Sequence, residues 1–196
     1  MPGAFEASAE FDHDPLATAE EIQRSGEGVL RWLEALADSD SPRLVDLHLV
    51  REIHHRWFET TFPADAGRDR TQMVLNRKGT AVEVDAILPA VLGACENWNW
   101  RRERLAPDND PELVEFAVAE ANVLTVRVYD VHPFIDGNTR TTWHLRNYLL
   151  MLDGLRPLID LNDQDRYEKA WWNTTAEDHD ELDDVVLDEL AAQDRA

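Results

Sequence analysis

Apolar residues recur every three or four positions along most of the chain, which is the spacing of the buried face of an amphipathic helix. The pattern is interrupted by short polar stretches that contain glycine or proline. It predicts helices over residues 16–37, 85–104, 110–129, 162–173 and 178–192. The protein is therefore expected to be mainly α.

Particular residue pairs mark the ends of the predicted helices. Ser41-Pro42 places a capping side chain before a proline at the first helical position, so we expect a helix to begin there and to end before a loop at 61–72. Asp110-Pro111 has the same form. Gly154 and Pro157 should end a further helix that begins near residue 138.

One segment departs from helical spacing. The sequence QMVLNRKGTAVEV, residues 72–84, has β-branched residues on both sides of a turn-forming Asn-Arg-Lys-Gly-Thr. Such a pattern predicts a short β-hairpin with a flexible tip. The expected fold is thus a helical domain with one short hairpin.

Composition narrows the class of protein. A chain of 196 residues fits one compact domain, which we divide into an N-terminal helical extension (1–40), a core (41–160) and C-terminal helices with an acidic tail (161–196). The net charge of −21 disfavours nucleic acid as a partner. A single cysteine, Cys95, and the lack of an apolar run of roughly 20 residues favour a soluble cytoplasmic protein with no membrane partner.

The stretch HPFIDGNTR, residues 132–140, carries the candidate chemistry. Because proline disfavours the helical conformation of the preceding residue, His132 should lie on an extended segment. The amides of Gly137, Asn138 and Thr139 should lie at a helix N-terminus, where unpaired donors and the helix dipole favour an anion. The Asn138 side chain and the Arg140 guanidinium can add donors for phosphate.

Asp136 would repel a phosphate unless a cation lies between them. Mg²⁺ commonly binds one or two carboxylates together with substrate phosphates, so one aspartate is sufficient. His132 can then act as the general base that takes a proton from an attacking hydroxyl. The alternative is a common surface turn with a structural histidine, since Asp-Gly and Gly-Asn are frequent turn dipeptides.

These nine residues resemble the signature of the Fic (Fido) family, His-Pro-Phe-x-(Asp/Glu)-Gly-Asn-Gly-Arg-x-x-Arg. The segment IHHRWFETTFPADAGRDRT, residues 53–71, is similar to another part of that family, and the resemblance spans roughly residues 45–155. It implies a Fic-type helical domain and transfer of AMP from ATP to a Ser, Thr or Tyr hydroxyl of a target protein.

The resemblance also implies the role of each site residue. His132 would be the base and Asp136 the Mg²⁺ ligand, and the phosphates of ATP would bind Gly137, Asn138, Thr139 and Arg140. The predicted hairpin, at about 73–84, lies where the family has a flap that aligns the target protein as an added strand. We call residues 73–84 the flap.

Two residues depart from the family signature. Thr139 replaces a glycine, which restricts the approach of the backbone to phosphate, and Trp143 replaces the second arginine. The Doc branch, whose members resemble kinases that transfer the terminal phosphate, also lacks both residues, so a Doc-like kinase is the first alternative to AMP transfer. A degenerate, non-catalytic Fic scaffold is the second. Arg146 lies one helical turn beyond Trp143 and is interpreted as a surface residue; the alternative is that it substitutes for the second arginine.

One weak sequence match bears on how the activity is regulated. The stretch QRSGEG, residues 23–28, resembles the inhibitory Ser/Thr-x-x-x-Glu-Gly/Asn motif of the family, with Gln23 in place of Ser or Thr and Glu27 as the regulatory acid. An ordinary helix-end acid is the alternative. If this inhibition is lost, the resemblance implies a toxin-like enzyme that a regulator or an antitoxin controls.

A second group of residues has metal-ligand spacing. His48, Glu52 and His55 fall on one face of a helix, but they lack the His-Glu-x-x-His order and an evident fourth ligand. A solvated polar face explains them at least as well.

Overall fold

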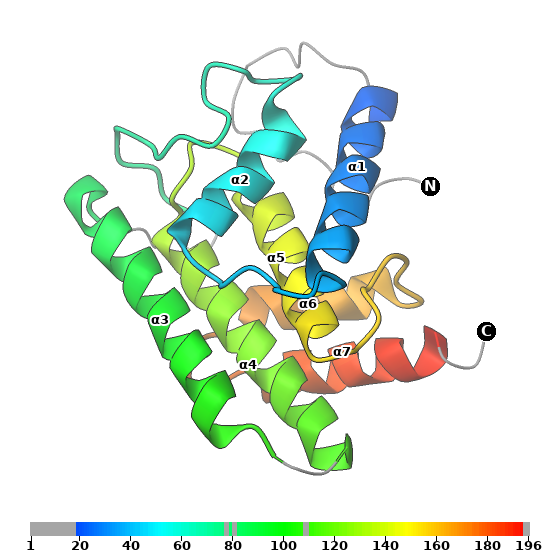
Figure 1. Cartoon of the computed structure of the whole chain (residues 1–196). Helices are drawn as coiled ribbons and strands as arrows, with labels where there is room; N and C mark the ends of the chain where they lie inside the picture. Colours follow the sequence, from blue (N-terminus) through cyan, green and yellow to red (C-terminus); the bar gives the residue numbers. More distant parts are fainter. Residues whose placement is uncertain (1–18, 77–78, 80–81, 108–109, 194–196) are drawn as a thin grey trace.

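The computed structural model describes residues 19–76, 79, 82–107 and 110–193. Within these ranges the chain forms seven α-helices and one short 3-10 helix, η1 (Figure 1). Their bounds are α1 Ala19–Ala37, α2 Leu47–Phe58, η1 Val84–Ala86, α3 Ile87–Leu105, α4 Asp110–Val131, α5 Asn138–Leu152, α6 Gln164–Asn173 and α7 Asp180–Gln193. The prediction of a mainly α protein is confirmed.

Helix α5 forms the centre of the bundle. It packs against α1, α2 and α4, while α3 and α7 contact the other sides of α4 (Figure 1). Most residues of α5 are buried, including several polar ones, so the helix is surrounded by protein on nearly all sides. Its N-terminus follows directly from the motif at 132–137, and the packing of α5 therefore fixes where that motif lies.

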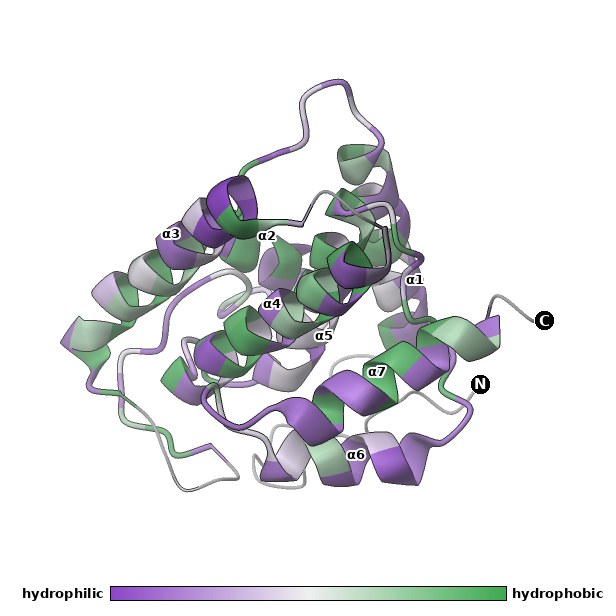
Figure 2. Cartoon of the chain, turned by 90° about the horizontal axis from the view of Figure 1, so that it is seen from below, coloured by the Kyte–Doolittle hydropathy of each residue, from purple (hydrophilic) through white to green (hydrophobic). Residues whose placement is uncertain are grey.

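One hydrophobic core joins the ends of the described chain. Val29 and Leu33 of α1 and Leu182 and Val185 of α7 belong to the same buried cluster. Helices α6 and α7 lie side by side, with hydrophilic and hydrophobic residues alternating along both (Figure 2). The division into residues 1–40, 41–160 and 161–196 stays a prediction, since residues 1–18 and 194–196 lie outside the described chain.

The predicted helix start at Ser41-Pro42 is wrong. Helix α2 begins five residues later, where the Asp46 carboxylate accepts the Leu49 N–H at 2.7 Å. The Asn99 side chain donates to the Val45 carbonyl at 2.7 Å, which holds the preceding residue outside the helix. Leu44, which precedes the helix, is 73% exposed. A stronger cap and a tertiary contact thus outweigh the local start signal.

The flap does not show the predicted hairpin. No strand occurs among the flap residues that the structure describes, which are 73–76, 79 and 82–84. A turn is present, because Gly79 has φ +72° and its N–H donates to the Asn76 carbonyl at 2.9 Å. Residues 77–78 and 80–81 lie outside the described chain.

No helix in the described part of the chain is both long enough and apolar enough to cross a lipid bilayer.

Two exposed glycines test how helix geometry contributes to stability. Gly93 lies inside α3 with nothing within 4 Å of an added Cβ, so Gly93→Ala should raise the free energy of unfolding by about 0.5–1 kcal/mol. Gly154 has equally open surroundings but φ +76°, so Gly154→Ala should lower it by about 1 kcal/mol. Urea denaturation measures both, and stabilisation by both substitutions would contradict the assigned backbone geometry.

Candidate active site

His132 directly follows α4 and adopts a left-handed backbone conformation, with φ +51°. The prediction of an extended residue is wrong. The His132 N–H still donates to the carbonyls of Tyr129 at 3.0 Å and Val128 at 3.3 Å, so the last turn of α4 ends in the left-handed geometry that glycine usually supplies. This conformation costs on the order of 1–2 kcal/mol for a residue with a side chain. Contacts between His132 and the surrounding residues must offset this cost.

The His132 imidazole is partly buried and packs edge-on against Tyr129, with ring centroids 5.6 Å apart. Burial lowers the pKa of His132 to about 4, and the nearby Arg70 cation acts in the same direction. The imidazole is therefore neutral near pH 7, which is the state that can accept a proton.

Arg70 is a buried residue of this site whose role the sequence did not indicate. Its Nε donates to the His132 carbonyl at 2.7 Å, and its backbone N–H donates to the Pro133 carbonyl at 2.8 Å. The rest of the guanidinium donates to the carbonyls of Gln72, Val82 and Val131. All these acceptors are main-chain oxygens, and no ion pair among the described residues includes Arg70.

His54 of α2 holds the other side of the motif. Its Nδ1 accepts the Gly67 N–H at 2.8 Å, so Nε2 carries the proton and donates to the Asp136 carbonyl at 3.1 Å. The ring stacks on Phe134 with centroids 3.9 Å apart. Burial lowers the pKa of His54 to about 4, which keeps this tautomer neutral. His54 therefore anchors the motif and lies between it and the segment that leads to Arg70.

Gly137 supplies a backbone bend at the start of α5. Its φ is +75°, and a Cβ at this position would lie 2.3 Å from the Phe58 ring. The first hydrogen bond of α5 runs from the Thr141 N–H to the Gly137 carbonyl at 2.9 Å. The amides of Asn138, Thr139 and Arg140 precede it and have no acceptor within the helix. Donors at a helix N-terminus are thus present at Asn138, Thr139 and Arg140, whereas the predicted Gly137 amide donates to the Asp136 carboxylate at 2.6 Å. Phosphate binding at these amides stays a prediction.

The Asn138 side chain is not the ligand donor that the sequence suggested. Its amide oxygen accepts the Phe134 N–H at 3.0 Å, and its amide nitrogen donates to the Phe134 carbonyl at 2.9 Å. The residue is buried. Because both ends of the amide bond the loop itself, Asn138 closes the loop and offers an anion only its backbone N–H.

Asp136 and Arg140 provide the charges of the loop. The Asp136 side chain is exposed, and one carboxylate oxygen accepts the Gly137 N–H at 2.6 Å, which leaves the other oxygen without that constraint. A single exposed carboxylate beside a set of anion-binding amides fits a Mg²⁺ ion shared with phosphates. The Arg140 guanidinium lies 5.9 Å from the Trp57 ring and 5.7 Å from the Phe58 ring. Burial lowers the pKa of Arg140, and no ion pair in the described chain includes it.

Arg146 is not the surface residue that the sequence suggested. It is 1% exposed, donates to the Tyr167 hydroxyl, and lies 5.0 Å from the Trp171 ring. Trp143 packs edge-on against Tyr167 with centroids 5.3 Å apart. Arg146 is therefore held between α5 and α6, and it does not supply the second arginine that Trp143 replaces.

Glu27 is not brought into the site. It is exposed on α1 and contacts Gln23 at 3.3 Å and Arg31 at 3.9 Å, both in its own helix. Its neighbour Gly26 faces α2, and an added Cβ there would lie 3.1 Å from the Trp57 ring. The structure supports the interpretation of Glu27 as an ordinary helix acid.

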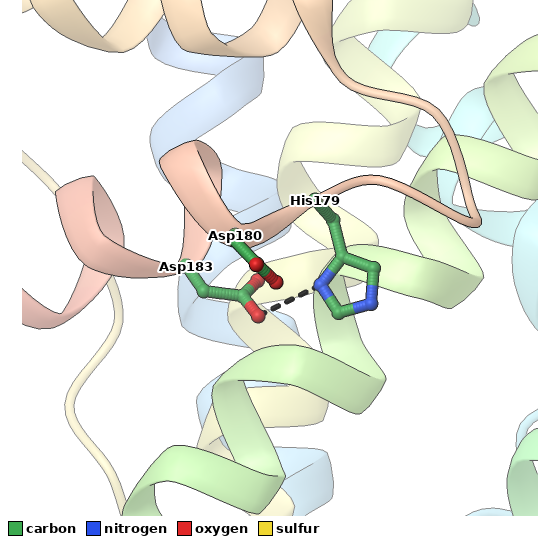
Figure 3. A group of neighbouring side chains, drawn as sticks. All are labelled: His179, Asp180 and Asp183. Carbon is green, nitrogen blue, oxygen red and sulfur yellow. Dashed lines mark hydrogen bonds and ion pairs between the residues drawn. The ribbon is translucent and has the colours of Figure 1, made fainter.

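The alternative metal group on α2 does not assemble. Glu52 bonds Arg56 at 2.8 Å, and His55 lies 3.4 Å from Glu59. Among the described residues, the group whose ligand atoms lie close enough to hold an ion is His179, Asp180 and Asp183 (Figure 3).

The contacts of that group are those of a helix cap. The His179 carbonyl accepts the Leu182 and Asp183 N–H groups at 3.0 and 2.9 Å, so His179 begins the first turn of α7. Its Nδ1 lies 2.7 Å from the Asp183 carboxylate, which also accepts the Asn122 amide of α4 at 2.7 Å. The group joins α7 to α4.

Comparisons with known proteins agree with this geometry. The family model described as the Fic/DOC family matches residues 44–150. Protein adenylyltransferase fic-1 of Caenorhabditis briggsae is 27% identical over 133 residues, and protein adenylyltransferase Fic of Nematostella vectensis is 30% identical over 158 residues. These alignments cover 68% and 73% of this chain but only 24% and 34% of the two relatives.

A solved structure shows the same fold. The crystal structure of a Fic domain-containing signaling protein from Bacteroides thetaiotaomicron is similar with a TM-score of 0.71 and 17% sequence identity, and the match covers 88% of this chain and 68% of that one.

The neighbouring residues His54 and His55 form a matched pair for testing the anchor. His54→Ala removes a buried ring that bonds the Gly67 N–H and the Asp136 carbonyl, so we expect the free energy of unfolding to fall by about 2–3 kcal/mol. His55→Ala removes an exposed ring and should change it by less than about 0.5 kcal/mol. Equal losses in chemical denaturation would contradict the anchoring role of His54.

Proposed function

The chain belongs to the Fic/DOC family, and from that membership we propose that it is a protein adenylyltransferase. In this proposal it transfers AMP from ATP to a Ser, Thr or Tyr hydroxyl of a target protein. The observation that carries the proposal is a neutral His132 on the same rigid loop as the amides at the start of α5. A binding module needs neither a base nor a strained loop that presents it.

The proposed reaction is an in-line displacement at the α-phosphorus of ATP. His132 accepts the proton of the target hydroxyl, and the hydroxyl oxygen forms a bond to the α-phosphorus. The bond from that phosphorus to the oxygen shared with the β-phosphate breaks, and pyrophosphate leaves with the bonding electron pair. The amides of Asn138, Thr139 and Arg140 and the Arg140 guanidinium stabilise the charge on the phosphate oxygens, while the Gly137 N–H stays bonded to the Asp136 carboxylate.

Asp136 is the residue that would hold Mg²⁺ in this scheme, through the carboxylate oxygen that the Gly137 N–H does not occupy. The bound ion would neutralise phosphate charge beside that carboxylate. The presence of the ion is itself part of the proposal, as is ATP as the nucleotide.

Transfer of the terminal phosphate is the second candidate function, because two observations favour it. Trp143 takes the place of the second arginine of the family signature, and Arg146 is held against Tyr167 and Trp171 instead of replacing it. Thr139 brings a side chain to the start of α5 where most family members have glycine. A Doc-like kinase reaction would use the same base and the same metal ligand, so it differs only in which phosphorus lies beside His132.

We also propose that the target protein docks on the flap, whose described limbs meet the motif through Arg70. Control would come from a regulator or an antitoxin, because Glu27 faces solvent. The third possibility, a non-catalytic scaffold, is separated from both enzymes by the absence of any transfer.

Labelled ATP distinguishes these functions. The protein is incubated with Mg²⁺, a cell lysate and ATP labelled on the α- or the γ-phosphate. We expect label in protein from the α-phosphate only, and a fall of roughly a hundred- to ten-thousand-fold in His132→Ala. His48→Ala, which removes an exposed histidine, is the matched control and should keep full transfer. Label from the γ-phosphate alone would overturn AMP transfer in favour of a kinase, and no label from either would favour the scaffold.

The pH dependence of transfer tests the state of His132. Because burial lowers the pKa of His132 to about 4, the proton-accepting form is fully present well above that value and is lost as pH falls through it. We therefore expect kcat/KM to stay flat from about pH 5.5 to about pH 8. Circular dichroism at each pH checks that the protein stays folded. An inflection near 6.5, the ordinary pKa of histidine, would contradict this environment.

A further inference from the structure

We propose that Arg70 is a positioning residue that couples the flap to His132. Its guanidinium bonds the main chain on both sides of the flap turn and the backbone of the histidine itself. The part of this proposal that concerns catalysis rests on the proposed function, whereas the coupling can be measured without any activity.

The hydrogen-bond acceptors of Arg70 lie in separate parts of the chain. One guanidinium bonds Gln72 immediately before the flap, Val82 in its returning limb, and His132 in the motif, which is 62 residues away in sequence from Arg70. The guanidinium is planar and rigid, so the positions of these three carbonyls are fixed relative to one another. A shift of the flap limbs therefore moves the carbonyl of His132, or breaks its hydrogen bond.

Burial of the Arg70 cation costs free energy. Arg70 is 3% exposed, and burial lowers its pKa. No carboxylate of the described chain forms an ion pair with Arg70. Main-chain carbonyls, the Met73 Sδ at 3.8 Å and the more distant Glu83 charge compensate for the water it has lost. Loss of any one of these carbonyls would leave a buried donor of the cation unpaired, which costs free energy. The flap limbs and the motif loop therefore stabilise each other in this arrangement.

Arg70 also holds the strained backbone of His132. His132 has φ +51°, and Arg70 bonds the carbonyls on both sides of the His132-Pro133 peptide, through Nε to His132 and through its backbone N–H to Pro133. Sparsely populated backbone conformations persist only where neighbouring contacts over-determine them. Arg70 supplies two such contacts and also faces the imidazole as a positive charge.

The same residue also joins the two ends of the flap. Its guanidinium bonds the Gln72 carbonyl just before the flap and the Val82 carbonyl in its returning limb. In a target-bound state, a segment added along the flap would act on these limbs, and Arg70 would carry the effect to the base. We therefore expect Arg70 to govern the rate of transfer to protein and not the affinity for ATP.

Hydrogen exchange tests the coupling directly. Arg70→Lys keeps the charge but loses the fork of donors, and Arg70→Met loses both. We expect both variants to raise amide exchange by about tenfold or more at two separate places, residues 71–76 with 82–83 and residues 131–134, and to leave α3 and α7 unchanged. Arg68→Met, which removes an exposed arginine two residues away, should change neither place.

Exchange that rises in the flap limbs but not at 131–134 would overturn the coupling. So would a uniform rise across all helices in Arg70→Lys, because it would show a general contribution to stability and no specific link.

Titration of the His132 imidazole by NMR separates the effect of the Arg70 charge from the effect of the hydrogen bonds that Arg70 donates. The charged or polar groups that face this ring are Arg70, the Tyr129 backbone of α4 and Asp136 of the loop, and only the first is changed. Burial is the larger cause of the low pKa and is kept in the variant, so Arg70→Met should raise the midpoint above about 4 only in part, whereas Arg70→Lys should keep it low. Equal midpoints in wild type and Arg70→Met would overturn the electrostatic part of the role.

Kinetics then links the coupling to the proposed reaction. With α-labelled ATP and lysate protein as acceptor, both Arg70 variants should lower kcat by about tenfold or more while the KM for ATP changes less than about twofold. A rise in KM for ATP at constant kcat would overturn the positioning role. If wild type transfers no label, the proposed function fails, and the exchange and titration results still decide whether Arg70 couples the flap to His132.

Discussion

The site depends on one backbone constraint, the left-handed conformation of His132 at the end of α4. The chain must leave α4, reverse direction and enter α5 within a few residues, and here a histidine occupies the position that glycine usually takes in such an ending. This geometry places His132 between the end of α4 and the loop that leads to α5. The cost is offset by contacts from a different part of the chain, chiefly Arg70 and its bonds to residues 131–133.

Other contacts of the loop also fix this reversal of the chain. His54 fixes the Asp136 carbonyl, Asn138 closes the loop on Phe134, and Phe58 fills the space that a side chain at 137 would need. Each of these contacts is buried or nearly so and uses main-chain atoms of the loop. The result is a neutral histidine, one exposed carboxylate and a set of helix amides on one loop, which is the arrangement that the proposed catalysis at a phosphate requires.

The sequence predicts the helices well, because periodicity and capping residues are local signals. Gly154 and Asp110-Pro111 mark real helix ends, whereas Ser41-Pro42 loses to the Asp46 cap. Errors arise where distant residues decide the conformation. The proline after His132 disfavours the right-handed helix but not the left-handed region, and the contacts that hold the latter include those of Arg70, 62 residues away. The contact between His54 and Asp136 spans 82 residues, and the burial of Arg146 depends on α6, so neither follows from local pattern.

The central claim is that the start of α5 receives phosphate, with the loop already in place. An NMR titration of uniformly labelled protein with Mg²⁺ and the non-hydrolysable ATP analogue AMPPNP tests it most directly. The account predicts saturable shifts that are largest at the backbone amides of residues 136–140, with little change in the described helices far from the loop. Saturable binding whose largest shifts lie elsewhere, for example around His179 and Asp183, would contradict it, as would the absence of any shift at these amides.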